Sequence, residues 1–444
     1  MIPLIDNELL NVIQVALGFF FIFCAFNSQG FIEETVISNA SDRGDISKYA
    51  GYTSLAIIYG VFTISNFAAA PVVRFIGPRW GMVFGSCCYA AFQAGFLHLN
   101  ETYLYVSSAV MGLGAAVLWT GQGNYLALNS TEANSKRNSG VLWGISQCCI
   151  AFGGIFLYLV FRNGGSHISD NTVKTLYGVF TALSIIGVIT IALLRTPPRV
   201  ASGENVDEAL GHGQLLISTF KLMITPEMIL MAFVFIYTGV ELSFWSGIYP
   251  TCISFTKKFG TNTNALLGLN AMAQGLGHFT GGLFFGILGD KTRRWGREPI
   301  ICLATAVHIA TLAGVYANIP SNAPLEKTDD TSLIEPSIPL ALVCGGLLCF
   351  ADACWNTQIY GFLVDNFKGK SAQAFAIYKF YQSGLACAAF FYGSKLQLEW
   401  HLVILAVTVV LGAISFFLAE HLMRRRSLSV ELKPRENEVF DEQF

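Results

Sequence analysis

The sequence predicts an all-α membrane protein whose twelve transmembrane helices form two pseudo-symmetric six-helix bundles. The first observation is the composition, because 53% of the 444 residues are hydrophobic and only 13% are charged, whereas a soluble domain carries roughly 25% charged residues. The second observation is a series of twelve apolar segments, each close to the ~20 residues that a bilayer core requires. The third is that the two halves of this series share short sequence similarities.

The twelve apolar segments are separated by short connections and one long break. No basic residue precedes the first segment and no clear small-residue cleavage site follows it. We therefore expect a membrane anchor there and not a removed signal peptide. The segments are 9–29, 49–70, 81–97, 103–124, 141–161, 175–194, 228–251, 264–288, 299–318, 338–360, 372–393 and 401–423.

The long break, 196–227, contains a Pro-Pro pair and a polar stretch, and it divides the chain into two halves. An Arg-Trp-Gly triplet follows the second segment of each half, and a Trp-x-x-Gln pattern ends the fourth, at Trp119–Gln122 and Trp355–Gln358. Two matches at corresponding places indicate a duplicated six-helix unit, as in many transporters. We expect one bundle at 1–195, a cytoplasmic linker at 196–227, a second bundle at 228–423 and a cytoplasmic tail at 424–444.

The orientation of the chain follows from its basic residues. With both termini in the cytoplasm, 18 of the 27 Lys and Arg residues lie in inside connections and 8 lie outside. Short cytoplasmic loops of membrane proteins carry such an excess of positive charge. The sequence therefore predicts a multi-pass protein with both termini cytoplasmic, and it does not indicate which cellular membrane holds it.

A connection between the eighth and ninth segments combines glycine, one acid and several basic residues. A glycine allows two helices to approach closely, and an acid at a helix end can pair with a basic partner that separates when the helices rock. We predict a gating loop here, with Asp290 as the latch. The alternative is a positively charged loop that only sets the orientation. The gating residues are Gly286, Asp290, Arg293, Arg294, Gly296 and Arg297.

Several stretches spread over nearly the whole chain carry a family resemblance. They are Ala25-Phe26-Asn27-Ser28-Gln29, Gly51-Tyr52-Thr53-Ser54 with Tyr59-Gly60, Gly77-Pro78, Leu118-Trp119-Thr120 with Gln122-Gly123-Asn124, Tyr237-Thr238-Gly239-Val240-Glu241 with Phe244, and Ala374-Phe375 with Lys379-Phe380. With the gating-loop pattern, they resemble the uncoordinated-93-like branch of the major facilitator superfamily. One departure is that the corresponding first-half loop, 71–79, lacks the acid of the superfamily.

The resemblance implies a major facilitator fold and leaves two functional classes open. Members of this branch resemble carriers whose solute is not assigned. Some relatives instead act as an accessory subunit of a potassium channel or as a trafficking chaperone for receptors. We expect alternating-access transport of a small solute, with proton or cation coupling through the second half as an option. The competing expectation is a non-transporting partner of another membrane protein.

Ionisable residues within the apolar segments are the candidates for a site, because burying a charge in a membrane costs at least ~2.5 kcal/mol. They all lie in the second half, and we expect none in the central portions of the first six helices. The resemblance implies that helices seven, eight, ten and eleven line the central cavity. We therefore select Glu241, His278, Asp352 and Lys379, and we expect His308 on the ninth helix to be a packed or interfacial residue.

Helical spacing adds neutral polar residues to these four. Asn270 and Gln274 lie on one helix face with His278, Asn356 lies one turn after Asp352, and Gln382 lies three residues after Lys379. Three interpretations stay open for the charged residues. Glu241 or Asp352 carries a coupled proton, or Glu241 and Lys379 form a permanent buried ion pair, or the charges recognise the solute.

Other function classes lack sequence support. We find no phosphate-binding glycine loop, no nucleophilic serine motif and no metal-ligand spacing, so we expect no enzyme activity, cofactor or metal. The net charge of −2 gives no indication of nucleic-acid binding. Among three Asn-x-Ser/Thr matches, Asn39 is the glycosylation candidate, because our topology places it outside. The expected partners are the lipid bilayer and a small solute. The competing hypothesis adds another membrane protein.

Overall fold

The computed structural model describes residues 7–130, 135–162, 168–197, 212–260, 262–292, 296–367 and 370–441, and these are almost entirely helical. Each of the twelve predicted segments falls, to within two residues at its ends, inside a described helix or inside consecutive helical elements. Within the described residues, nine helices are long and apolar enough to cross a membrane. The predicted fold class, an all-α membrane protein, is therefore confirmed.

The first bundle is built around α4 and α1. Helix α4 packs against α2 and α3, α1 packs against α5 and α6, and α3 closes the group against α6. The elements are α1 (Asn7–Ser41), α2 (Ala50–Ile76), α3 (Pro78–Gly95), the short 3-10 helix η1 (Phe96–His98), α4 (Glu101–Leu128), α5 (Ser135–Phe161) and α6 (Asp170–Ala192).

The second bundle follows α8 (His212–Met223), a helix inside the segment that we expected to be a plain linker. Helix α13 packs against α11 and α12, and α9 packs against α14 and α15. The elements are α9 (Pro226–Ser243), the π turn η2 (Phe244–Ile248), α10 (Tyr249–Phe255), the 3-10 helix η3 (Lys257–Phe259), α11 (Thr263–Thr292), α12 (Glu298–Asn318), α13 (Ile338–Asn366), α14 (Ser371–Gly393) and α15 (Leu398–Asp441).

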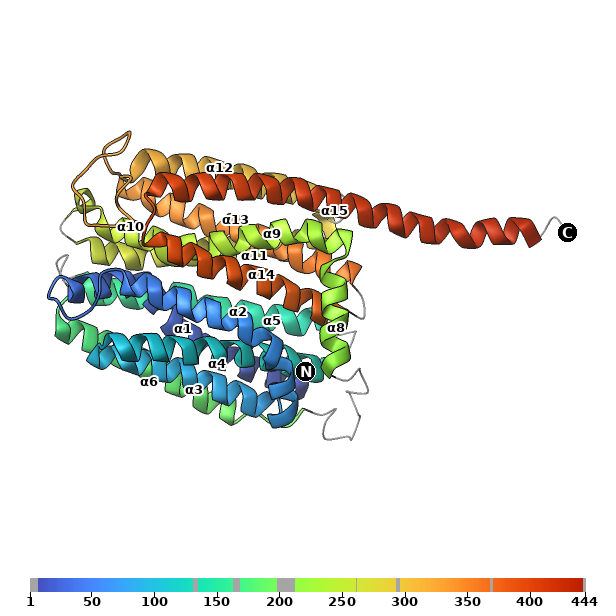
Figure 1. Cartoon of the computed structure of the whole chain (residues 1–444), viewed down its shortest axis with the longest axis horizontal. Helices are drawn as coiled ribbons and strands as arrows, with labels where there is room; N and C mark the ends of the chain where they lie inside the picture. The colour runs from blue at the N-terminus through green and yellow to red at the C-terminus, as the bar shows by residue number, and fades with distance from the viewer. Residues whose placement is uncertain are drawn as a thin grey trace, which may run out of the picture.

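The two bundles lie side by side with their helices roughly parallel, and Figure 1 shows both chain termini at one end. We call this the proximal end. The opposite, distal end carries the connections 42–49 and 319–337. Helix α8 runs across the proximal end between the bundles, and α15 continues well beyond it (Figure 1).

Helix starts follow from local chemistry. The Asn100 side chain accepts a hydrogen bond from the Tyr103 backbone N–H (3.0 Å) and caps α4, and Ser169 caps α6 in the same way through Thr172. Such side chains satisfy N–H groups that have no partner within the helix. Proline stands in the first turn of α3, α9, α12 and α13, where its missing N–H costs nothing.

The bundles meet along two seams. On one, α5 of the first bundle packs against α11 of the second, and Gly154 faces Gly268. A Cβ atom at Gly268 would lie 2.4 Å from the Tyr158 backbone nitrogen, so only glycine permits this approach of the two backbones. On the other seam, α2 packs against α14, and the Thr63 hydroxyl donates to Ser383 Oγ (2.8 Å).

Helix α1 is longer than predicted. The sequence indicated a first segment of 9–29, but α1 continues to Ser41 and buries Glu33 and Glu34 inside the first bundle. The expectation of a neutral first-half interior was therefore wrong. The two acids resembled a water-facing helix end, whereas α2, which begins at Ala50, covers them in the structure.

Candidate functional site

Glu241 lies in the last full turn of α9, directly before the π turn, and its side chain is only 1% exposed. Its Oε1 lies 3.0 Å from Nε2 of His308 on α12. The Tyr237 hydroxyl, one turn earlier on α9, contacts the other ring nitrogen, Nδ1, of the same histidine. A carboxyl, an imidazole and a phenol from two helices therefore form one buried cluster.

His308 is buried, as expected of a packed residue, and it also contacts a candidate site acid. The residue is 2% exposed, and its Nε2 faces both Glu241 and the Leu348 carbonyl oxygen (3.2 Å). Two acceptors on one nitrogen require that this nitrogen carry the hydrogen. Nδ1 then accepts from the Tyr237 hydroxyl, and a neutral ring satisfies all three contacts.

Asp352 of α13 forms a second carboxyl–imidazole pair. Its Oδ2 lies 2.9 Å from Nε2 of His278 on α11, and its Oδ1 accepts from Asn356 Nδ2 (2.8 Å) one turn later. The carboxyl of Asp352 lies within electrostatic range of that of Glu241. Two buried acids close together repel each other when both are ionised, so a proton on one of them stabilises the pair.

Hydrogen bonds continue from Asp352 to Lys379. The Tyr378 hydroxyl donates to Asn356 Oδ1 (2.6 Å), Gln382 Nε2 donates to the Tyr378 oxygen (3.0 Å), and Lys379 Nζ donates to Gln382 Oε1 (2.8 Å). We call the whole set the second-bundle polar network. Its members are Tyr237, Glu241, His278, His308, Asp352, Asn356, Tyr378, Lys379 and Gln382.

Lys379 is partly buried on α14, the helix that packs against α2 of the first bundle. The predicted alternative of a direct Glu241–Lys379 ion pair is not formed, because Glu241 contacts His308 and Lys379 contacts Gln382. Among the described residues, no carboxylate lies within 4.0 Å of Lys379 Nζ. Lys379 is therefore a partly buried cation on a helix that packs against the first bundle, and neutral side chains join it to the acids.

Asn270 and Gln274 share a helix with His278 but lie outside the hydrogen-bonded network. Gln274 Nε2 donates to the Trp245 backbone carbonyl (2.8 Å), which ties α11 to the π turn. Asn270 is fully buried, and its Oδ1 stands against Gly345 of α13. The Trp245 ring covers His278 at 5.1 Å between centroids. The polar face of α11 thus contacts the π turn through Gln274 and α13 through Asn270, in addition to Asp352 through His278.

Only part of the predicted gating loop can be compared with the structure. Gly286 and Asp290 lie in α11, but the Asp290 side chain is outside the described residues, as are Arg293 and Arg294. Gly296 joins α11 to α12 with a positive φ of 77°. The Asp290 latch thus stays a prediction.

Arg297, the last residue of the predicted gating loop, holds three helices of the second bundle together at the proximal end. It binds both carboxylate oxygens of Glu420 (3.0 Å each) and contacts Asp365 (2.5 Å). The start of α12 is thereby attached to α13 and α15. The guanidinium thus uses Nη1 for Glu420 and Nη2 for Asp365, so its planar geometry fixes the two carboxylates relative to each other.

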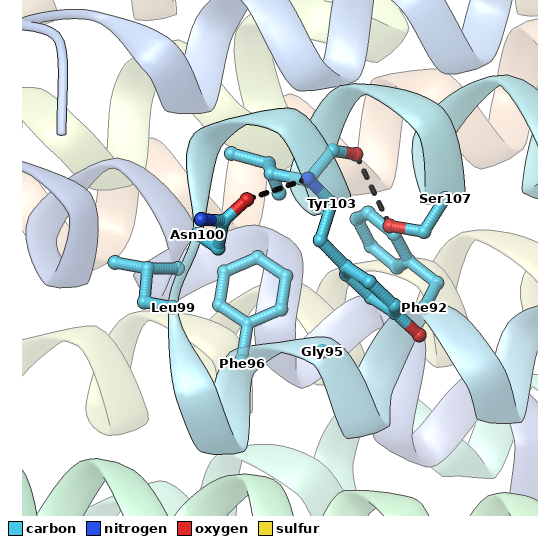
Figure 2. Close-up of a pocket in the computed structure, with 8 residues that line it drawn as sticks. Phe92, Gly95, Phe96, Leu99, Asn100, Tyr103 and Ser107 are labelled. Atoms are coloured by element: carbon cyan, nitrogen blue, oxygen red, sulfur yellow. Dashed lines mark hydrogen bonds between the residues drawn. The ribbon is translucent and has the colours of Figure 1, made fainter.

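Two remaining features of the described residues lie at the distal end. Asn39, the predicted glycosylation residue, is 3% exposed within α1, and its Oδ1 accepts from Lys327 Nζ (2.8 Å). A glycan on this buried side chain would have to displace that contact. Figure 2 shows a shallow recess at the α3–α4 turn, beside the Asn100 cap. Its lining lacks ionisable carboxyl, imidazole or amino groups, so it is not the candidate site.

Comparison with known proteins gives a consistent result. Residues 42–417 match the family described as ion channel regulatory protein UNC-93. The chain is 38% identical over 441 residues to UNC93-like protein MFSD11 of Xenopus laevis, covering 95% of this chain and 98% of that protein. It is 25% identical over 485 residues to protein unc-93 homolog A of Homo sapiens, covering 99% of each.

Solved structures with the same arrangement of helices include two transporters. The nucleoside transporter NupG superimposes with a TM-score of 0.64 at 13% identity, covering 92% of this chain and 98% of that one. The peptide transporter POT in complex with sulfate superimposes with a TM-score of 0.66 at 10% identity, covering 94% and 95%. At these identities the likeness concerns the fold alone.

Proposed function

The chain belongs to the UNC-93 family and has the major facilitator fold, and from this premise we propose that it is a proton-coupled carrier that moves a small solute by alternating access. The resemblance found in the sequence is thereby confirmed at the level of family and fold. The protein is a multi-pass membrane protein. We further propose that both termini face the cytoplasm, as the distribution of basic residues favours.

The proximity of two buried acids, Glu241 and Asp352, is the observation that supports coupling most directly. Both acids are buried, their described partners are neutral groups or histidines, and they lie on different helices, α9 and α13. A buried acid pair without Lys or Arg holds a proton more readily than an exposed one. A proton held there changes the charge of the second bundle by one unit, which is what a coupled carrier requires.

The polar network connects this proton site to the seam between the bundles. In our proposal, loss of the shared proton rearranges the hydrogen bonds that run through Asn356, Tyr378 and Gln382 to Lys379. Lys379 lies on α14 against the first bundle, where it can meet an anionic group of the solute. Solute binding and proton binding are thereby linked through one chain of side chains.

Transport is tested with purified protein in liposomes that contain a pH-sensitive dye. A panel of amino acids, short peptides, nucleosides and carboxylic acids is added outside under an imposed pH gradient. We expect at least one solute to enter in a saturable way and to change the internal pH. Glu241→Gln should retain exchange of this solute but lose the proton movement, because an amide resembles a permanently protonated acid.

Asp170→Asn is the matched control, because it makes the same change at an exposed carboxylate that pairs with Arg43 on the surface. It should behave as wild type. Saturable uptake without any proton movement would remove coupling from the proposal. If no solute of the panel enters, the carrier proposal itself fails.

The family description favours a second candidate function, regulation of an ion channel. A regulatory subunit would need its surface more than its buried polar network. Recovery of one channel by affinity purification, with a current that depends on this chain and is unaltered by Glu241→Gln, would support this alternative. Uptake that Glu241→Gln uncouples from protons would count against it.

A further inference from the structure

Glu33 of α1 is a fully buried acid that the second-bundle mechanism does not use. It is 0% exposed, and Gln29 Nε2, one turn earlier, donates to its Oε2 (3.0 Å). The hydroxyl of Ser54 on α2, which forms a hydrogen bond with Ser108 Oγ (3.0 Å), lies beside the Glu33 carboxylate. The other carboxylate oxygen, Oε1, has no hydrogen-bond partner. Glu33 is thus held by neutral groups on two helices.

The neighbouring Glu34 is also buried, but its negative charge is compensated by nearby groups. Its Oε2 accepts from the Tyr52 backbone N–H (3.0 Å) in the first turn of α2, and the positive charge of Lys48 acts on it. A carboxylate at a helix N-terminus interacts favourably with the helix dipole. Glu34 therefore has a helix end and a cation, whereas neither acts on Glu33.

Among the described residues, the groups around Glu33 are oxygen-rich and none of them is a cation. Glu34 is its charged neighbour on α1, and the hydroxyls of Tyr59 on α2 and Tyr177 on α6 lie within electrostatic range. The Tyr177 hydroxyl and Gln29 Oε1 are buried without hydrogen-bond partners. Since the Gln29 amide already contacts Glu33, its Oε1 is an unpartnered acceptor at the same place.

An ionised carboxylate in a dry bundle is too costly to persist without a compensating positive charge. The acceptors left without partners are oxygens of a carboxylate and an amide, which suit hard cations. One positive charge balances one carboxylate. We propose that Glu33, Gln29 and Ser54 form a binding site for a small monovalent cation, H⁺ or Na⁺, in the first bundle.

Occupancy of this site would act on the distal end of the molecule. Ser54 and Tyr52 lie on the same helix, and the Tyr52 hydroxyl donates to the Pro324 carbonyl oxygen (3.1 Å) in the 319–337 connection of the second bundle. A cation between α1 and α2 therefore stabilises the part of α2 that contacts the other bundle. The site would be a second place, beside the second-bundle polar network, at which an ion biases the closure of the protein.

The test measures thermal unfolding of the full-length protein in lipid nanodiscs, without any solute. One series raises Na⁺ at constant pH, with choline keeping the ionic strength fixed, and the other lowers the pH in choline alone. We expect the unfolding temperature of the wild type to rise by about 2–4 °C in at least one series. Glu33→Gln should lose this rise, because the amide carries no charge for the cation to neutralise.

Glu34→Gln is the matched control, since it removes the adjacent charge and should retain the rise. A gain in the sodium series identifies Na⁺, and a gain only in the pH series identifies a proton. Equal gains in the wild type and in Glu33→Gln would overturn the proposal, as would the absence of a gain in both series. If Glu33→Gln does not fold, Gln29→Met must shift the midpoint of the titration, and an unchanged midpoint would also overturn it.

Discussion

The Glu241–His308 contact offers a test at the level of single side chains. Replacing His308 by Leu leaves Glu241 and Tyr237 without their partner, so we expect the free energy of unfolding to fall by about 2–4 kcal/mol. Combining it with Glu241→Met should restore part of the loss, because both ends of the contact are then apolar. Thermal unfolding of the two single variants and the double variant measures this coupling.

A parallel set with Lys379→Met in place of His308→Leu is the control. Lys379 donates to Gln382 and does not contact Glu241, so its effect should add to that of Glu241→Met. A stronger coupling of Glu241 to Lys379 than to His308 would contradict the arrangement that we describe.

The sequence identified most of the polar network because charges inside apolar segments are rare and costly. Glu241, Asp352 and Lys379 were found in that way, and helical spacing added Asn356 and Gln382. His308 was found too but was assigned to a peripheral helix, because no sequence pattern shows that α12 directs one side chain between α9 and α13. Tyr378 was missed, since a tyrosine in an apolar helix carries no distinguishing signal.

At the level of elements, helix ends were the weakest part of the prediction. The predicted first segment stops at residue 29, but α1 runs on to Ser41 and includes the acids Glu33 and Glu34. Hydropathy measures how each residue partitions on its own. It does not register that the start of α2 supplies a backbone N–H to one of these acids. A buried acid that another helix satisfies therefore resembles an exposed one.

Arg297 provides a prediction at the scale of elements. Among the described residues, its side chain alone joins the start of α12 to both α13 and α15 through carboxylates. Arg297→Met leaves the buried Glu420 with only its weaker contact to Arg424 (3.4 Å). We expect a loss of about 1–3 kcal/mol in the free energy of unfolding. Arg297→Lys should recover only part of it, since one compact ammonium group lacks the two separate nitrogens that reach Glu420 and Asp365.

The control for this loss is Arg43→Met. Arg43 pairs with Asp45 and Asp170 at an exposed site, where ion pairs contribute about 0–1 kcal/mol. The comparison is made by thermal unfolding under one buffer condition. Equal losses for the two arginines would mean that the proximal contact is no stronger than a surface pair.

At the scale of the whole molecule, the distal end is closed by contacts between the bundles. Lys327 in the 319–337 connection reaches the first bundle, where Nζ donates to Asn39 Oδ1 (2.8 Å) and Asp42 Oδ2 (3.1 Å). Lys327→Met should favour opening of this end. We expect faster labelling by a maleimide reagent at Cys252, which is buried in α10, in a variant that retains this cysteine alone.

Lys257→Met distinguishes loss of closure from loss of a charge. Lys257 pairs with Asp329 of the same connection, but both residues belong to the second bundle (2.9 Å). The rate of maleimide labelling at Cys252 in this variant should match that of the protein that retains Lys257. An equal increase for both variants would show that the Lys327 contact does not hold the bundles together.

The fold class was predictable from the sequence, since a bilayer demands long apolar segments and the two halves resemble each other. The way in which the bundles meet was not. The contact of Thr63 with Ser383 joins positions 320 residues apart, and neither residue differs in type from many other serines and threonines of the chain. Such a pairing depends on the complete packing of both bundles.

The seam between α5 and α11 has a mechanical consequence. Where Gly154 faces Gly268, no side chain separates the two backbones. One bundle can therefore rotate relative to the other about this line without repacking side chains. The opposite seam, between α2 and α14, is made of side-chain contacts that can be broken and remade. Lys379 is carried by α14, a helix of that opposite seam. A small rotation about the α5–α11 contact would therefore move α14 farther than the groups near α11.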